Sequence, residues 1–249
     1  MVYLVTGVLG AIIGSFLNVC IYRIPRGDSV LRPRSHCPRC DAVIRFYDNI
    51  PILSFLILRG RCRQCGSPIP WRYPLVEAIN TVGYISLLLK FGPGWHLLVY
   101  ASLFSALIVV TFIDLSHQIV PDRITLPGIV IGAIAAATVL PAGLVNALIG
   151  IFLGGGLFYL VAILSRGGMG GGDIKLIAMI GAFLGWRDVL LTIFIAALTG
   201  SMVGLYLMIM LGKGRKYPVP FGPFLAIGAV VSLYWGPEIM IWYSQLGSY

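Results

Sequence analysis

The chain has few charged residues for its length. Only 11% of its 249 residues are Asp, Glu, Lys or Arg, whereas 58% are hydrophobic and the mean hydropathy is +0.93. Soluble domains carry roughly 25% charged residues, so this composition excludes an ordinary soluble protein. Acidic residues are the scarcest charged group, nine in all, and any of them that lies in an apolar segment therefore stands out.

Other features are missing as well. The amino-terminal segment lacks the basic start and the small-residue cleavage site of a secretory signal peptide, so we expect a retained first helix. The three histidines show no metal-ligand spacing with one another. Residues 23–72 contain no glycine-rich loop leading into a helix, and hence no nucleotide-binding motif of that kind.

Long apolar runs are abundant and predict an all-α polytopic membrane protein with about eight transmembrane helices. Seven runs have roughly spanning length, whereas residues 174–186 are too few to span unless the helix begins near the preceding glycine tract. Glycines four residues apart, such as Gly10 and Gly14, predict close packing between helices. The runs are 2–22, 73–89, 95–113, 124–140, 143–164, 174–186, 189–211 and 221–243.

The basic residues gather in one segment, residues 23–72, which holds ten of the 18 Lys and Arg. If this segment is cytoplasmic and the spans alternate, only Lys90 and Arg187 lie outside. The positive-inside rule therefore explains the net charge of +9, and we reject nucleic acid as a partner. The other cytoplasmic basic residues are then Arg123, Arg166, Lys175, Lys213, Arg215 and Lys216.

We divide the chain into a first transmembrane helix (1–22), a cytoplasmic insert (23–72) and a seven-helix membrane domain (73–249). The insert contains two C-x-x-C pairs, Cys37/Cys40 and Cys62/Cys65, within a weak repeat of 25 residues. Four thiolates suit a closed, tetrahedral structural Zn2+ site. Two disulfides are the alternative, which a reducing cytoplasm disfavours. Cys20, in the first helix, is expected to be a buried apolar residue.

Between the two cysteine pairs, the apolar stretch 50–58 is too short to span. It either lies at the membrane surface or forms the hydrophobic core of the insert.

Two aspartates stand in apolar surroundings on the predicted cytoplasmic side. Asp114 ends one apolar run, and Asp173 follows a glycine tract and opens another. A carboxylate there is costly unless it is paired, protonated or hydrated. Two close carboxyl groups can share a proton, one acting as general base and the other as general acid, as in aspartic proteases. An ion relay in a transporter fits the same residues, and Asp173 could merely cap a helix.

Several neighbours of the aspartates are candidates for supporting roles. Gly170 and Gly172 permit unusual backbone angles and close approach of a substrate. Asp122 is expected to be the N-cap of the following helix, from which it could assist Asp114. Lys175 should diverge from Asp173 and extend towards the interface rather than form a pair. Glu77, in the second span, is functional by default, with exposure at the interface as the alternative.

The motifs in order resemble those of the bacterial type IV prepilin leader peptidases, which are GxGD-type membrane aspartic proteases. The resemblance rests on Gly14-Ser-Phe-Leu-Asn-Val19, the paired C-x-x-C insert, Arg72-Tyr-Pro-Leu-Val-Glu77, Phe112-Ile-Asp114 through Asp122, Gly170-Gly-Gly-Asp173-Ile-Lys-Leu176 and Pro220-Phe-Gly-Pro-Phe224. The presenilin-type Pro-Ala-Leu element is absent from the sequence.

This resemblance implies Asp114 and Asp173 as the catalytic pair. It implies cleavage of the basic leader of type IV prepilins or pseudopilins after a glycine, at the cytoplasmic face of the bacterial inner membrane. It also implies methylation of the new amino terminus by S-adenosylmethionine, for which Glu77 and Asn80 are guesses at the cofactor site. The competing hypotheses are a proton-coupled transporter that relays ions through the two aspartates and a zinc-dependent membrane scaffold.

Overall fold

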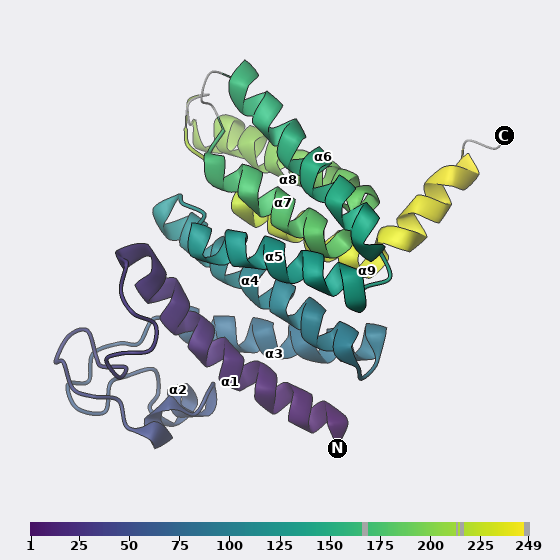
Figure 1. The fold of residues 1–249 in the computed structure, drawn as a ribbon. Coiled ribbons are helices and arrows are strands. Elements are labelled where there is room, and N and C mark those ends of the chain that lie inside the picture. Colours follow the sequence, from purple (N-terminus) through teal and green to yellow (C-terminus); the bar gives the residue numbers. More distant parts are fainter. Residues whose placement is uncertain (166–168, 213, 215–216, 247–249) are drawn as a thin grey trace. The chain divides into compact units, whose positions relative to one another are not determined.

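The computed structural model describes residues 1–165, 169–212, 214 and 217–246. The chain forms two compact units, Met1–Val109 and Val110–Tyr249 (Figure 1). Four basic residues of the predicted topology lie outside the described residues: Arg166, Lys213, Arg215 and Lys216. The boundaries predicted at residues 22 and 72 rest on hydropathy and charge along the sequence, not on how the helices pack. They stay a prediction.

The first unit pairs two long helices and carries the insert. Because α1 and α3 pack along each other, they bring together the two ends of the insert, which leaves α1 and returns at α3. The elements are α1 (Val2–Arg23), η1 (Ile24–Arg26), η2 (Phe46–Asn49), α2 (Leu53–Ile57), α3 (Arg72–Phe91) and the first part of α4 (Trp95–His117).

Small residues allow α1 and α3 to pack closely against each other. A β-carbon at Gly14 would lie 2.7 Å from the Cα of Glu77, and one at Gly10 would lie 2.9 Å from the Cα of Thr81. Both distances are too short for a real side chain, so the close packing predicted from the glycine spacing is confirmed here. Cys20 is buried in α1, as expected.

Four of the nine residues in the apolar stretch 50–58 are exposed. Leu53, Leu56 and Ile57 are 56%, 61% and 72% exposed, whereas Ser54 is buried. These three exposed side chains are not part of a core, whereas Phe55 packs against Trp71. Both alternatives for this stretch therefore stay predictions.

The second unit is built around α7 (Gly171–Leu184). Every residue from Leu176 to Leu184 is buried, because α5, α6, α8 and α9 all pack against this helix. Figure 1 shows α7 between α5 and the α6–α8 pair. The other helices are the end of α4, α5 (Asp122–Thr138), α6 (Gly143–Leu164), α8 (Trp186–Leu211) and α9 (Gly222–Leu246).

All eight predicted apolar runs are helices, and the all-α polytopic fold is confirmed. Within the described ranges, five helices are long and apolar enough to cross a membrane, namely α1, α4, α6, α8 and α9. Each of the three others, α3, α5 and α7, fails at least one of these two conditions. That they span the membrane stays a prediction. As expected, α7 begins in the glycine tract rather than at its first apolar residue.

Candidate active site and metal centre

Asp114 lies in the last turn of α4 and is only 5% exposed. Its Oδ2 accepts a hydrogen bond of 2.8 Å from the backbone N–H of Gly222, the first residue of α9. A buried carboxylate needs such a donor, because it has left water. The start of α9 therefore holds one oxygen of Asp114 in place.

The position of Gly222 leaves no room for a side chain. A β-carbon there would lie 2.7 Å from Oδ2 of Asp114 and 3.3 Å from its Cγ. Sequence reasoning missed this residue as part of the site. The available signal was the motif Pro220-Phe-Gly-Pro-Phe224, which contributed only to the resemblance.

Asp173 is the third residue of α7 and is half-buried. The N-cap of α7 is Gly170, so capping by Asp173 itself is wrong, because the helix starts before the apolar run. Gly170 has φ −71°, an angle open to any residue, and the expected unusual geometry is not seen there. Gly172 instead allows a close contact, because its β-carbon would lie 2.7 Å from Cβ of Val120.

The structure brings the two aspartates together. The carboxyl groups of Asp114 and Asp173 interact electrostatically, although they are far apart in the sequence. Two carboxyl groups near enough to influence each other's ionisation can divide the roles of general base and general acid. Their catalytic role stays a prediction.

Lys175 forms an ion pair that the sequence did not predict. Its Nζ lies 2.7 Å from both carboxylate oxygens of Asp122, so the expectation that Lys175 extends without a partner is wrong. The N-cap role for Asp122 is also wrong, since α5 begins at Asp122 and its N-cap is Pro121. The pair joins the first residue of α5 to Lys175 of α7, two residues after Asp173.

The four cysteines of the insert come together. Their Sγ atoms all lie within 4.8 Å of one another, and those of Cys37 and Cys65 are 3.9 Å apart. A tetrahedral site with Zn–S bonds of about 2.3 Å has sulfur atoms roughly 3.8 Å apart, so the donor set fits Zn2+. All five cysteines are free thiols, and the disulfide alternative is not supported.

Hydrogen bonds favour the thiolate form that binds metal at two of the four cysteines. Hydrogen bonds from the backbone of Arg39 and Cys40 lower the pKa of the Cys37 thiol to about 6. Hydrogen bonds from Ser67 lower the pKa of Cys65. At Cys40, the backbone hydrogen bond of Ala42 is outweighed by burial and by hydrogen bonds with the other three thiols, which raise the pKa to about 11. Because a metal ligand must be deprotonated, only Cys37 and Cys65 are prepared for a cation in this way.

The two cysteine loops repeat each other in three dimensions. The N–H of Cys37 donates to the carbonyl of Ala42, and the N–H of Cys62 donates to that of Ser67, each pair of positions being 25 residues apart. Two equivalent loops facing one another explain the repeat in the sequence.

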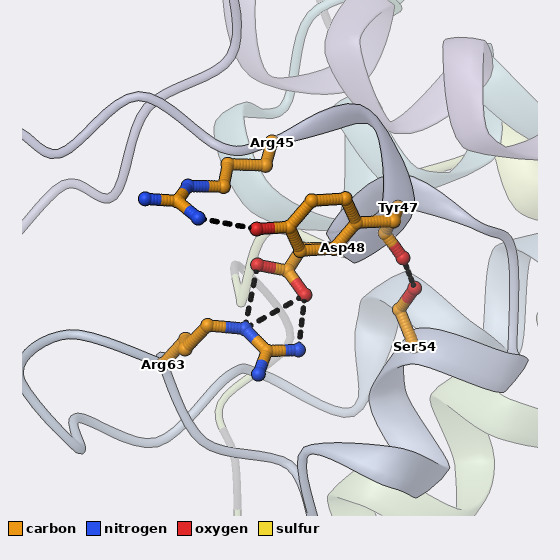
Figure 2. Close-up of polar contacts among 5 residues, drawn as sticks. All are labelled: Arg45, Tyr47, Asp48, Ser54 and Arg63. Carbon is orange, nitrogen blue, oxygen red and sulfur yellow. Dashed lines mark hydrogen bonds and ion pairs between the residues drawn. The ribbon is translucent and has the colours of Figure 1, made fainter.

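A second contact ties the second cysteine loop to η2, as Figure 2 shows. Arg63, between Cys62 and Cys65, donates to Asp48 in η2 through Nε at 2.9 and 3.0 Å and through Nη2 at 2.6 Å. These hydrogen bonds lower the pKa of Asp48. Beside them, Arg45 donates to the hydroxyl of Tyr47.

Glu77 and Asn80 lie in the first unit and both are buried. Glu77 accepts a 2.7 Å hydrogen bond from the N–H of Ile52 in the insert, so exposure at the interface is wrong for it. The Asn80 amide is engaged at both ends, donating to Gly10 and accepting from Ser105. A cofactor role for either residue stays a prediction.

The comparisons with known proteins agree with this layout. A model described as the bacterial peptidase A24 N-terminal domain matches residues 8–91, and one for the type IV leader peptidase family matches residues 101–205. The chain belongs to the type IV leader peptidase family. It is therefore an enzyme, a peptidase of the multi-pass membrane type, and this membership does not favour the transporter alternative.

The curated relatives extend over nearly the whole chain. A prepilin leader peptidase/N-methyltransferase of Legionella pneumophila is 37% identical over 97% of this chain and 94% of its own length. Proteins of the same name are 35% identical in Pseudomonas aeruginosa, over 99% of this chain and 94% of the relative, and 42% identical in Myxococcus xanthus, over 85% and 64%. No solved structure matches the chain.

Proposed function

We propose that this leader peptidase is an aspartyl endopeptidase that removes the short basic leader of type IV prepilins or pseudopilins after a glycine. We further propose that it methylates the new amino terminus with S-adenosylmethionine. The observation that carries the first activity is the electrostatic interaction between the carboxyl groups of Asp114 and Asp173. The names of the relatives support both activities.

The hydrogen bonds around the pair suggest how the roles divide. Asp114 accepts the N–H of Gly222, which stabilises its ionised form, so we assign it as the general base. Asp173 then holds the shared proton and acts as the general acid. Two negative charges so close together would repel each other, and this repulsion favours one proton on the pair.

The chemistry then follows without a nucleophilic side chain. Asp114 takes a proton from a water molecule, whose oxygen adds to the scissile carbonyl carbon while Asp173 protonates the carbonyl oxygen. Asp114 next passes its proton to the amide nitrogen, the carbon–nitrogen bond breaks, and Asp173 recovers its proton from the collapsing hydroxyl. The products are the free leader and a pilin with a new α-amino group.

The proposed topology places this reaction at the cytoplasmic face of the inner membrane. Residues 23–72 carry ten Arg and three Asp, a charge of +7, which repels a basic leader. We therefore assign these arginines to anionic lipid headgroups and to topology. The exposed apolar side chains of the stretch 50–58 would rest on the same membrane surface.

Zinc has a structural role in this proposal. Cys37, Cys40, Cys62 and Cys65 would hold it, and four thiolates leave no open position for a water or substrate. S-adenosylmethionine, when bound, supplies an electrophilic methyl group to the new amine. The chain must then hold that amine unprotonated and exclude water from it.

The test follows the mass of a prepilin incubated with the purified enzyme in lipid. Wild type should remove the leader, whereas Asp114→Asn and Asp173→Asn should not. With S-adenosylmethionine, the wild-type product should gain the mass of one methyl group. Cleavage that survives both substitutions would refute the aspartate mechanism.

A further inference from the structure

Buried polar side chains line the seam between α1 and α3 at the ends that flank the insert. Asn18 of α1 is only 2% exposed. Its amide nitrogen donates to the carbonyls of Tyr73 at 3.0 Å and of Gly14 at 3.4 Å. Because both partners are acceptors, they fix which end of the amide is the nitrogen. The orientation of the carbonyl oxygen of Asn18 follows from these two bonds.

That oxygen is left without a partner. Among the described residues, Oδ1 of Asn18 is buried and makes no hydrogen bond, and the same holds for Nε of Arg72, the residue before Tyr73. A buried polar atom without a partner costs roughly 1–3 kcal/mol. One acceptor is therefore left unpaired on Asn18, and one cationic donor on the residue that precedes its partner Tyr73. The guanidinium of Arg72 also lies over the ring of Tyr73, 5.4 Å from its centroid.

A carboxylate lies on this seam as well. Glu77 follows Tyr73 by one helical turn and abuts Gly14. It accepts hydrogen bonds from the N–H of Ile52 and from the side chain of Ser15, yet a carboxylate has about four acceptor sites. Ile52 has φ +61°, which is strained for a β-branched residue and directs the backbone of the insert to this carboxylate.

We propose that this seam binds the amino-acid end of the methyl donor, with Asn18 Oδ1 and Glu77 receiving its α-ammonium group and Arg72 its α-carboxylate. The inference rests on the methylation proposed above. It names a zwitterion because the seam offers open acceptors and an open guanidinium donor, which suits a carboxylate. The new amino terminus of a cleaved pilin is also an ammonium group, but it lacks the carboxylate that Arg72 would need.

This assignment differs from the guess that the sequence allowed. Asn80 was named there, but its amide is already engaged at both ends. Asn18 carries the same group with its acceptor oxygen open. The structure thus favours Asn18 over Asn80 as a ligand of the donor.

The experiment measures binding of radiolabelled S-adenosylhomocysteine to the full-length protein in nanodiscs of fixed phospholipid composition. Loss of a charge-assisted hydrogen bond should weaken binding by about tenfold or more in Arg72→Gln and in Asn18→Leu. Tyr84→Phe is the matched control. It removes a buried hydrogen bond to Ser105 from the same helix α3, and affinity should stay within about twofold of wild type.

A second ligand tests the contact with Arg72 directly. The analogue of S-adenosylhomocysteine that lacks the carboxylate should bind wild type more weakly, and Arg72→Gln should not weaken it further. Such non-additivity is the signature of a direct contact. This arm is independent of Asn18→Leu, which could disturb the packing of α1, because Arg72 Nε has no partner to lose.

The outcomes separate this site from the proposed function. If wild type cleaves prepilin but binds no S-adenosylhomocysteine, the methylation proposal fails and the peptidase stands. If wild type binds and methylates while the Asn18 and Arg72 variants keep full affinity, only the site is wrong. Loss of binding of a mature pilin peptide in Asn18→Leu, with cofactor affinity intact, would assign the seam to the methyl acceptor and overturn the proposal.

Discussion

Replacing Gly222 with alanine should disable cleavage without disturbing substrate binding. The added β-carbon would lie 2.7 Å from Oδ2 of Asp114, whereas ordinary contact begins at 3.4 Å. The carboxylate or the start of α9 must therefore shift, and the 2.8 Å hydrogen bond from the Gly222 N–H is lost or lengthened.

The size of the effect follows from that bond. A hydrogen bond to a charged group contributes about 1.5–3 kcal/mol, which corresponds to a fall in kcat of about 10- to 160-fold. KM for the prepilin should change by less than about twofold, because the lost contact is to Asp114 and not to substrate. The assay is steady-state cleavage in nanodiscs, with the fraction of folded protein measured separately.

Gly228→Ala provides the control, because it makes the same chemical change in the same helix. Its β-carbon would lie 2.5 Å from the carbonyl oxygen of Thr192, a contact of similar severity away from the aspartates. This variant should lower thermal stability but keep kcat per folded molecule. If the two variants lose kcat equally, the proposed role of the Gly222 N–H is wrong.

Two further predictions concern the ion pair and the metal. Lys175→Met or Asp122→Asn should lower kcat by about two- to fivefold, because a half-exposed pair contributes only about 0.2–1 kcal/mol. The double exchange Lys175→Asp with Asp122→Lys should restore part of the loss, and no rescue would argue against a positioning role. A strong chelator should release one Zn2+ per chain, measured by mass spectrometry of the metal, and should lower the thermal stability of the insert. Cys37→Ser should reduce the metal content in the same way, whereas a full complement of zinc in this variant would contradict the four-thiolate site.

Much of the fold could be predicted from local sequence patterns. Each predicted apolar run is a helix, because spanning length and hydrophobicity are properties of consecutive residues. The gathering of Cys37, Cys40, Cys62 and Cys65 also followed from spacing, since two similar loops can share one tetrahedral ion. The scarcity of acidic residues, together with their position in apolar runs, was sufficient to draw attention to Asp114, Asp173 and Glu77.

Contacts between distant segments could not be predicted from the sequence. Gly222 lies 108 positions from Asp114, and Lys175 lies 53 positions from Asp122. Nothing in the local pattern around these residues specifies which partner they meet, because hydrogen-bond partners in a bundle depend on which helices pack and how closely.

The sequence by itself thus determined the helices, the cysteine site and the charged residues that an apolar chain keeps. The tertiary structure alone decided that the start of α9 donates to Asp114, that Lys175 joins α5 to α7, and that Asn18 keeps an open acceptor. The physical reason is that hydrophobic periodicity is read from neighbouring residues, whereas burial and hydrogen-bond satisfaction are properties of the packed molecule.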